Sequence, residues 1–137
     1  MDIPLKLAMI GCGKVGAPTA DLLVKIGHDV RRYDTAFETG FSLEEAIEDR
    51  DYIFIAVPTP HEKEYDGSQP TSHLPAKDFD YTILKDVVTH IKLFQPDTPI
   101  VIISTVLPGT MRRLFGNCAG APIIYNPFLI SMGNVEH

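Results

Sequence analysis

Three glycines and the turn that contains them provide the first chemistry in this sequence. The stretch GCGKVG places Gly11, Gly13 and Gly16 in the G-x-G-x-x-G spacing, between a predicted strand and a predicted helix. Gly11 would allow a tight turn, Gly13 would let backbone N–H groups approach a pyrophosphate, and Gly16 would let the helix pack closely on the strand. The first helical turn, with Lys14 and Val15, adds unpaired N–H donors that attract an anion.

Asp34 adds a second element of the same site. It ends the second predicted strand, where a carboxylate can accept hydrogen bonds from both ribose hydroxyls of an adenosine. The same carboxylate would repel a 2′-phosphate, and residues 35–49 contain no Lys or Arg to reverse that preference. The sequence therefore predicts a dinucleotide site that prefers NAD to NADP. The alternative is a glycine turn without a ligand and Asp34 as a surface residue.

Prolines and hydroxyl groups end two further predicted strands. The apolar run YIFIAV stops at Pro58, Thr59 and Pro60, because proline prevents its continuation as a central strand. Ser104 and Thr105 end the next predicted strand. In a parallel sheet, ligands bind outside the carboxyl ends of the strands. One rim would therefore collect Gly11–Gly16, Asp34, Val57–Pro60, Ser104–Thr105 and Tyr125–Pro127.

Alternating strands and helices must position these residues. The predicted strands are 5–11, 28–34, 52–57, 99–105 and 122–125, and the predicted helices are 14–27, 42–50, 80–94 and 108–116. This order implies an α/β fold: a Rossmann-type doubly wound parallel sheet of about five strands, with helices on both faces. Residues 58–78 are polar and proline-rich and form a predicted long loop, of the kind that is usually functional or mobile.

Two helices carry more detailed signals. Ser42, followed three residues later by Glu45, is a capping-box pattern. The helix at 80–94 is predicted to be amphipathic, with five apolar residues on one shared face. Its members are Ile83, Leu84, Val87, Val88 and Ile91.

Length and composition exclude several classes of protein. The 137 residues fit one domain, 1–137, and 45% hydrophobic with 22% charged residues is ordinary for a globular protein. A net charge of −6 argues against a nucleic-acid surface. No apolar run is long enough to span a membrane, and the N-terminus lacks a signal peptide, so we expect a cytoplasmic protein without membrane contact. Cys12 and Cys118 make no disulfide framework, and the histidines have no metal spacing.

With these motifs in place, the sequence resembles the UDP-glucose/GDP-mannose dehydrogenase family. GCGKVGAPTA is similar to the family's G-x-G-x-V-G-x-P-x-A start, and AVPTP to its third-strand ending. STVLPGT is similar to its S-T-x-x-x-G-T segment, and YNP to the start of its Y/N-P-E-F-L segment. The resemblance implies that Thr59 contacts NAD. It also implies that Thr105 lies near the reacting carbon and orients a water or the substrate hydroxyl. The alternatives are a turn-filling role for Thr59 and a helix-capping role for Thr105.

The resemblance further implies the NAD-binding domain of a nucleotide-sugar 6-dehydrogenase, most simply for UDP-glucose. Such an enzyme oxidises a primary alcohol to a carboxylate with two NAD, through a thiol in a later domain, and its full-length form could be a homo-oligomer. Five strands fall one short of a complete dinucleotide domain, and the sequence suggests that the missing strand would follow PIIY. We therefore expect the substrate and C-terminal domains to be absent from this chain and the chain alone to be inactive. Two alternatives remain: a 3-hydroxyisobutyrate/6-phosphogluconate-type dehydrogenase domain, or a non-catalytic NAD-sensing module.

The sequence also departs from the family pattern. Thr39 stands where the family often has a Lys, and the segment between Asp34 and the third strand is short. Phe128 stands where a catalytic Glu is expected, and a phenyl ring cannot transfer a proton. Cys12 and Cys118 are expected to be inert, because one lies inside the glycine turn and the other in a loop.

Overall fold

The computed structural model describes residues 3–128, and every strand and helix predicted from the sequence is present. The strands are β1 (Lys6–Ile10), β2 (Asp29–Tyr33), β3 (Tyr52–Ile55), β4 (Ile100–Ile102) and β5 (Ile123–Tyr125). The helices are α1 (Gly16–Lys25), α2 (Leu43–Ile47), α3 (Thr82–Phe94) and α4 (Thr110–Phe115), with a 3₁₀-helix η1 at Lys63–Tyr65. Most of these elements are shorter than predicted, because an apolar sequence pattern can continue beyond the last residue that makes a regular backbone hydrogen bond.

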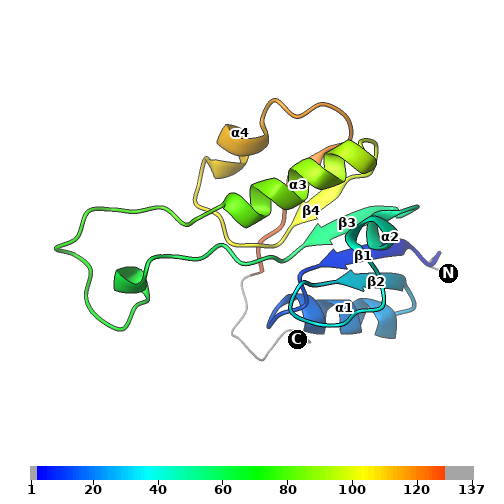
Figure 1. Cartoon of the computed structure of the whole chain (residues 1–137), viewed down its shortest axis with the longest axis horizontal. Helices are drawn as coiled ribbons and strands as arrows, with labels where there is room; N and C mark the ends of the chain where they lie inside the picture. Colours follow the sequence, from blue (N-terminus) through cyan, green and yellow to red (C-terminus); the bar gives the residue numbers. More distant parts are fainter. Residues whose placement is uncertain (1–2, 129–137) are drawn as a thin grey trace.

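All five strands are parallel and form one sheet in the order β2-β1-β3-β4-β5 (Figure 1). β1 lies between β2 and β3, with Leu7 opposite both Val30 and Tyr52. β4 pairs with β3 and β5, so Ile100 lies opposite Ile53 and Ile123. This register brings the carboxyl ends of the strands to one rim, and the predicted Rossmann-type α/β class is confirmed.

The strand order can be compared with the common orders of doubly wound sheets. The six-stranded Rossmann order is 3-2-1-4-5-6. The observed order equals it with strand 3 removed and the later strands renumbered. It is also the five-stranded order of flavodoxin-like sheets, 2-1-3-4-5. Among residues 3–128, β2 is therefore an edge strand, and the short connection 34–42 runs where strand 3 of the six-stranded order would lie. The segment after Phe128 lies outside the described residues.

Helices cover both faces of the sheet (Figure 1). On one face α2, α3 and α4 pack over a core that contains Ile53, Ile55, Ile100 and Ile102, all fully buried. On the other face α1 packs through Ala20 against Met9 and Ile103. The core therefore fixes the sheet on which the rim is built.

The buried stripe of α3 is narrower than the sequence predicts. Leu84, Val88 and Ile91 are buried, at i, i+4 and i+7. Ile83 is 44% exposed and Val87 only partly buried, so the predicted apolar face is only in part buried in the core. Both residues sit on a neighbouring stripe of the helix, which the structure turns toward the rim.

The predicted long loop is confirmed, and it extends away from the sheet between β3 and α3 (Figure 1). Its base is closed by the N–H of Asp80, which donates to the carbonyl of Pro60 at 2.8 Å. Within the loop, the hydroxyl of Tyr65 donates to the carbonyl of Pro75 at 2.6 Å, and Lys77 pairs with Glu62. The single turn of η1 is the one regular element that the sequence does not predict there.

The capping box of α2 is also confirmed. The hydroxyl of Ser42 accepts the N–H of Glu45 at 3.2 Å, and the carboxylate of Glu45 accepts the N–H of Ser42 at 2.8 Å. This cap lets the helix begin only a few residues after Asp34, which makes the short connection possible.

Candidate functional site

The glycine turn between β1 and α1 is built on contacts too close for any side chain. Gly11 has a φ of +96°, and a Cβ there would lie 2.4 Å from the carbonyl oxygen of Ala56. A Cβ on Gly16 would lie 1.8 Å from the carbonyl oxygen of Gly11. The tight turn at Gly11 and the close packing at Gly16 are therefore as the sequence predicts. Together they press the start of α1 against the chain that follows β3.

Gly13 differs from the other two glycines. It is exposed, and no atom lies within 4 Å of the position that a Cβ would occupy. Val15, the N-cap residue of α1, provides no side-chain cap, so the first N–H groups of the helix lack that partner. An open backbone beside an uncapped helix N-terminus fits a phosphate group.

The carboxylate of Asp34 ties the glycine turn to the loop that follows β2. One oxygen accepts the N–H of Cys12 at 2.7 Å, and the other accepts the N–H of Ala36 at 2.7 Å. Each carboxylate oxygen can accept a further hydrogen bond. Asp34 can therefore hold the turn in place and still accept hydroxyl groups from a ligand.

A cavity of about 320 Å³ joins these features. It runs from the glycine turn past Asp34 to the end of β3 and the first turns of α3, and its walls are mostly apolar. Such a volume suits a small-molecule ligand, because ligand pockets are typically apolar clefts with a few polar groups. It is lined by Ile10, Gly11, Gly13, Tyr33, Asp34, Thr35, Ala36, Phe37, Ala56, Val57, Pro58, Ile83 and Val87.

The cavity brings together five of the predicted site residues and adds others. The five are Gly11, Gly13, Asp34, Val57 and Pro58. Lys14 is exposed outside its lining, and Val15 packs against the α1 core. The sequence does not predict the apolar wall formed by Phe37, Ile83 and Val87. The sequence does contain one signal for this wall: Phe37 is a large apolar residue in a polar loop, three residues after the acidic residue that follows β2.

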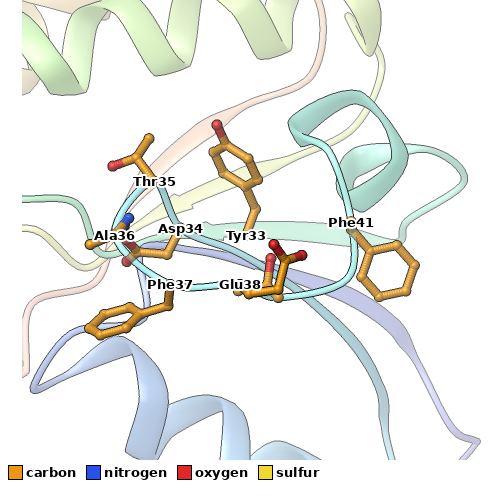
Figure 2. Close-up of a pocket in the computed structure, with 8 residues that line it drawn as sticks. Tyr33, Asp34, Thr35, Ala36, Phe37, Glu38 and Phe41 are labelled. Atoms are coloured by element: carbon orange, nitrogen blue, oxygen red, sulfur yellow. Dashed lines mark hydrogen bonds between the residues drawn. The ribbon is translucent and has the colours of Figure 1, made fainter.

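The loop after β2 forms a second, more open hollow of about 460 Å³ beside this cavity (Figure 2). Figure 2 shows Tyr33 and Thr35 on the side of the loop that faces α3, and Phe37 on the side of α1. Phe37 is 57% exposed and lines both spaces. The loop therefore presents polar and aromatic groups around Asp34, and no strand among residues 3–128 lies outside β2 to cover them.

The hydroxyl residues at the ends of β3 and β4 lie together, outside the lining of this cavity. The hydroxyl of Thr59 donates to the carbonyl of Thr105 at 2.8 Å, and that of Ser104 donates to the carbonyl of Val57 at 2.7 Å. Ser104 is buried, whereas Thr105 is exposed. Gly109 is the N-cap residue of α4, so the structure does not support a capping role for Thr105. Pro60, also predicted, is exposed at the base of the long loop.

The two cysteines and Phe128 lie in three different environments. Burial and the nearby carboxylate of Asp34 raise the pKa of the Cys12 thiol, which lowers its thiolate fraction and its reactivity. Cys118 is exposed in the loop after α4. Phe128 is partly buried and packs with Met9, Ala20 and Ile103. Its surroundings are those of a packing residue.

Residues 3–128 contain neither a metal-binding cluster nor a helix that could span a membrane. No group of three or more His, Cys, Asp or Glu side chains there could hold a metal ion. No helix in that range combines the length and the apolar character needed to cross a bilayer.

Comparison with known proteins places this geometry in context. The model of the "UDP-glucose/GDP-mannose dehydrogenase family, NAD binding domain" matches residues 32–122, more than half of the chain. A search of curated proteins gives no significant match.

Several solved structures share the fold. A UDP-glucose dehydrogenase from Pyrobaculum islandicum is 24% identical, with a TM-score of 0.67 over 96% of this chain and 37% of that one. A GDP-mannose dehydrogenase from Pseudomonas aeruginosa is 22% identical, with a TM-score of 0.61 over 96% and 38%. A 3-hydroxyisobutyrate dehydrogenase from Mycobacterium tuberculosis is 19% identical, with a TM-score of 0.63 over 91% and 40%. The chain thus spans about two fifths of the length of these proteins.

Replacing Gly16 and Gly13 by alanine should separate folding from binding. Gly16→Ala should lower the free energy of unfolding by about 2–3 kcal/mol, because its Cβ would overlap a backbone oxygen. Gly13→Ala should leave stability unchanged or raise it by up to about 1 kcal/mol, since the position is open and its φ is not positive. The same variant should weaken NAD binding by about tenfold or more, or ~1.4 kcal/mol, because the methyl group fills the approach to the turn. Urea unfolding and calorimetry would measure both effects; equal stabilities for the two variants would contradict the contact geometry.

Proposed function

Because the chain belongs to the UDP-glucose/GDP-mannose dehydrogenase family through its NAD-binding domain, we propose that it supplies the NAD site of a nucleotide-sugar 6-dehydrogenase. The observation that carries the proposal is the single cavity that joins the glycine turn to Asp34. NAD itself provides the hydride-accepting chemistry, and the protein provides position and electrostatics.

In this proposal, the cavity takes the adenosine half of NAD. Gly13 and the N-terminus of α1 would receive the pyrophosphate, and Asp34 would accept hydrogen bonds from the ribose hydroxyls. The apolar wall that includes Phe37 and Ile83 suits a flat base, because both side chains are large, line the cavity and remain partly exposed. Lys14, Val15 and Gly16 would form the helical side of the phosphate turn.

The ends of β3 and β4 would take the nicotinamide half. Val57, Pro58 and Pro60 would wall the ring, with Thr59 beside it. Thr105 is the residue that we assign to catalysis, because its side chain is exposed at the rim while its carbonyl is held by Thr59. Ser104 would contribute through the backbone, since its hydroxyl already donates to Val57.

The substrate would be a nucleotide sugar, with UDP-glucose the first to test. The structure of a 3-hydroxyisobutyrate dehydrogenase superposes about as well as those of the nucleotide-sugar enzymes, so the fold does not separate these substrate classes. The VPTP and STVLPGT segments and the matching family favour the nucleotide-sugar class. A non-catalytic NAD sensor would need only the adenosine half, and it would leave Thr59 and Thr105 without a ligand.

NAD should bind more tightly than NADP, because the Asp34 carboxylate repels a 2′-phosphate. Asp34→Ala should weaken NAD binding roughly ten- to hundredfold, the effect of losing a hydrogen bond to a charged group, and should narrow the gap between the cofactors. Calorimetry with both cofactors would measure this. Asp97→Asn, at an exposed acid away from the cavity lining, is the control and should change neither affinity. A preference for NADP in the unmodified chain would remove the assignment of Asp34 to the ribose.

Chemical-shift mapping should divide the rim into two halves. NAD and ADP-ribose should both perturb the amides of Gly13 and Asp34, whereas only NAD should perturb those of Thr59 and Thr105. The reason is that ADP-ribose lacks the nicotinamide ring. Identical responses of Thr59 and Thr105 to the two ligands would leave the catalytic assignment of Thr105 without support.

The isolated chain should not turn over nucleotide sugars. The reaction implied by the resemblance needs a thiol nucleophile, and burial and the Asp34 charge raise the pKa of Cys12. Absorbance of NADH with UDP-glucose or GDP-mannose should therefore show no sustained increase. Sustained turnover that disappears in Cys118→Ser, but not in Cys12→Ser, would instead assign the thiol to Cys118.

A further inference from the structure

The segment Thr105–Leu107 follows β4 and belongs to no helix or strand. Backbone N–H and C=O groups outside regular structure need other hydrogen-bond partners, because unpaired groups are costly when shielded from water. The carbonyl of Leu107 accepts the backbone N–H of Thr110 at 3.1 Å, and the other recorded partners of the segment's backbone are side-chain hydroxyl groups from other parts of the chain. The backbone that carries the exposed Thr105 side chain is therefore held in part by hydrogen bonds from side chains of other elements.

Two tyrosines supply most of these contacts. The hydroxyl of Tyr81 accepts the N–H of Leu107 at 3.0 Å. The hydroxyl of Tyr125 accepts the N–H of Val106 at 3.3 Å and donates to the carbonyl of the same residue at 3.4 Å. Tyr81 lies at the start of α3 and Tyr125 at the end of β5, so the segment is hydrogen-bonded to two different elements.

Tyr81 is itself fixed by further contacts. Tyr81 is 6% exposed, and its hydroxyl donates to the carboxylate of Asp78, at the end of the long loop. The other oxygen of Asp78 accepts from the guanidinium of Arg113 in α4 at 3.2 Å. The same guanidinium lies 6.0 Å from the centre of the Tyr81 ring. Because the hydroxyl proton points to Asp78, a lone pair of the oxygen is left for Leu107.

We propose that Tyr81 and Tyr125 are positioning residues, which hold the Thr105–Leu107 segment so that Thr105 meets the nicotinamide half of NAD. This rests on the proposed function of Thr105. The two hydroxyls and that of Thr59 bond to consecutive residues, Thr105, Val106 and Leu107, which is the pattern expected where geometry must be kept near a reacting group. Neither tyrosine needs to touch NAD for this role.

Phenylalanine variants test the inference, because they remove only the hydroxyl. Hydrogen exchange followed by NMR should show about tenfold faster exchange of the Leu107 amide in Tyr81→Phe and of the Val106 amide in Tyr125→Phe. The amide of Ile102 in β4 serves as the reference for global opening and should not change relative to wild type. Tyr65→Phe is the matched control, since it removes a tyrosine-to-carbonyl hydrogen bond within the long loop.

Binding provides the second measurement. The affinity for ADP-ribose should stay within about twofold of wild type in both variants, whereas the affinity for NAD should fall about three- to tenfold, the size expected for one lost hydrogen bond. Tyr65→Phe should change neither affinity. If Tyr81→Phe fails to fold, Tyr125→Phe, whose hydrogen bonds are longer, decides the question by the same two readouts.

Three results would overturn the inference, and they are distinguishable. Unchanged exchange at Val106 and Leu107 would show that the tyrosines do not hold the segment. Faster exchange with an unchanged ratio of NAD to ADP-ribose affinity would show that holding it has no consequence for the cofactor. Equal binding of NAD and ADP-ribose by the wild-type chain would overturn both this inference and the proposed nicotinamide site.

Discussion

The close contact between the glycine turn and the chain after β3 is the constraint on which the site depends. Gly11, Gly16 and Ala56 approach so closely that no Cβ fits at either glycine. This contact places the N-terminus of α1 at the rim where the parallel strands end. It also brings the N–H of Cys12 within reach of Asp34, so one carboxylate serves both the turn and the loop after β2. Positioning by backbone packing leaves little freedom, because a packed backbone cannot give way as a side chain can.

The short connection between β2 and α2 determines the shape of the cavity. With no strand outside β2 among the described residues, the loop 34–42 must form the outer wall alone. Asp34 stabilises this loop by accepting the N–H of Ala36, and the loop ends at Ser42, where the capping box starts α2. This arrangement leaves apolar side chains such as Phe37 and Ile83 exposed. Both line the cavity, so in the proposed function the base of the ligand would cover them.

The two halves of the rim are built differently. Around the glycine turn, geometry follows from close backbone contacts, whereas at the ends of β3 and β4 it follows from hydroxyl groups that bond to carbonyls and N–H groups of the neighbouring loop. Hydrogen bonds of this kind contribute about 0.5–1.5 kcal/mol each, so this half is the more easily disturbed by single substitutions. Tyr81 also links it to Asp78 and Arg113, which makes the base of the long loop part of the same network.

The sequence by itself determined the α/β class, the order of the elements, the capping box at Ser42 and the cofactor, because these follow from local patterns of apolar residues, glycine and short motifs. It also singled out Gly11, Gly16 and Asp34, whose roles depend on residues close in the chain or at strand ends. Tertiary structure alone decided that β2 is an edge strand of the described sheet, that Ile83 faces a cavity, and that Tyr81 and Tyr125 meet the segment after β4. These features depend on contacts between residues far apart in sequence. A helical repeat cannot tell a core stripe from a neighbouring cavity stripe, and a tyrosine carries no local sign of which backbone its hydroxyl will reach.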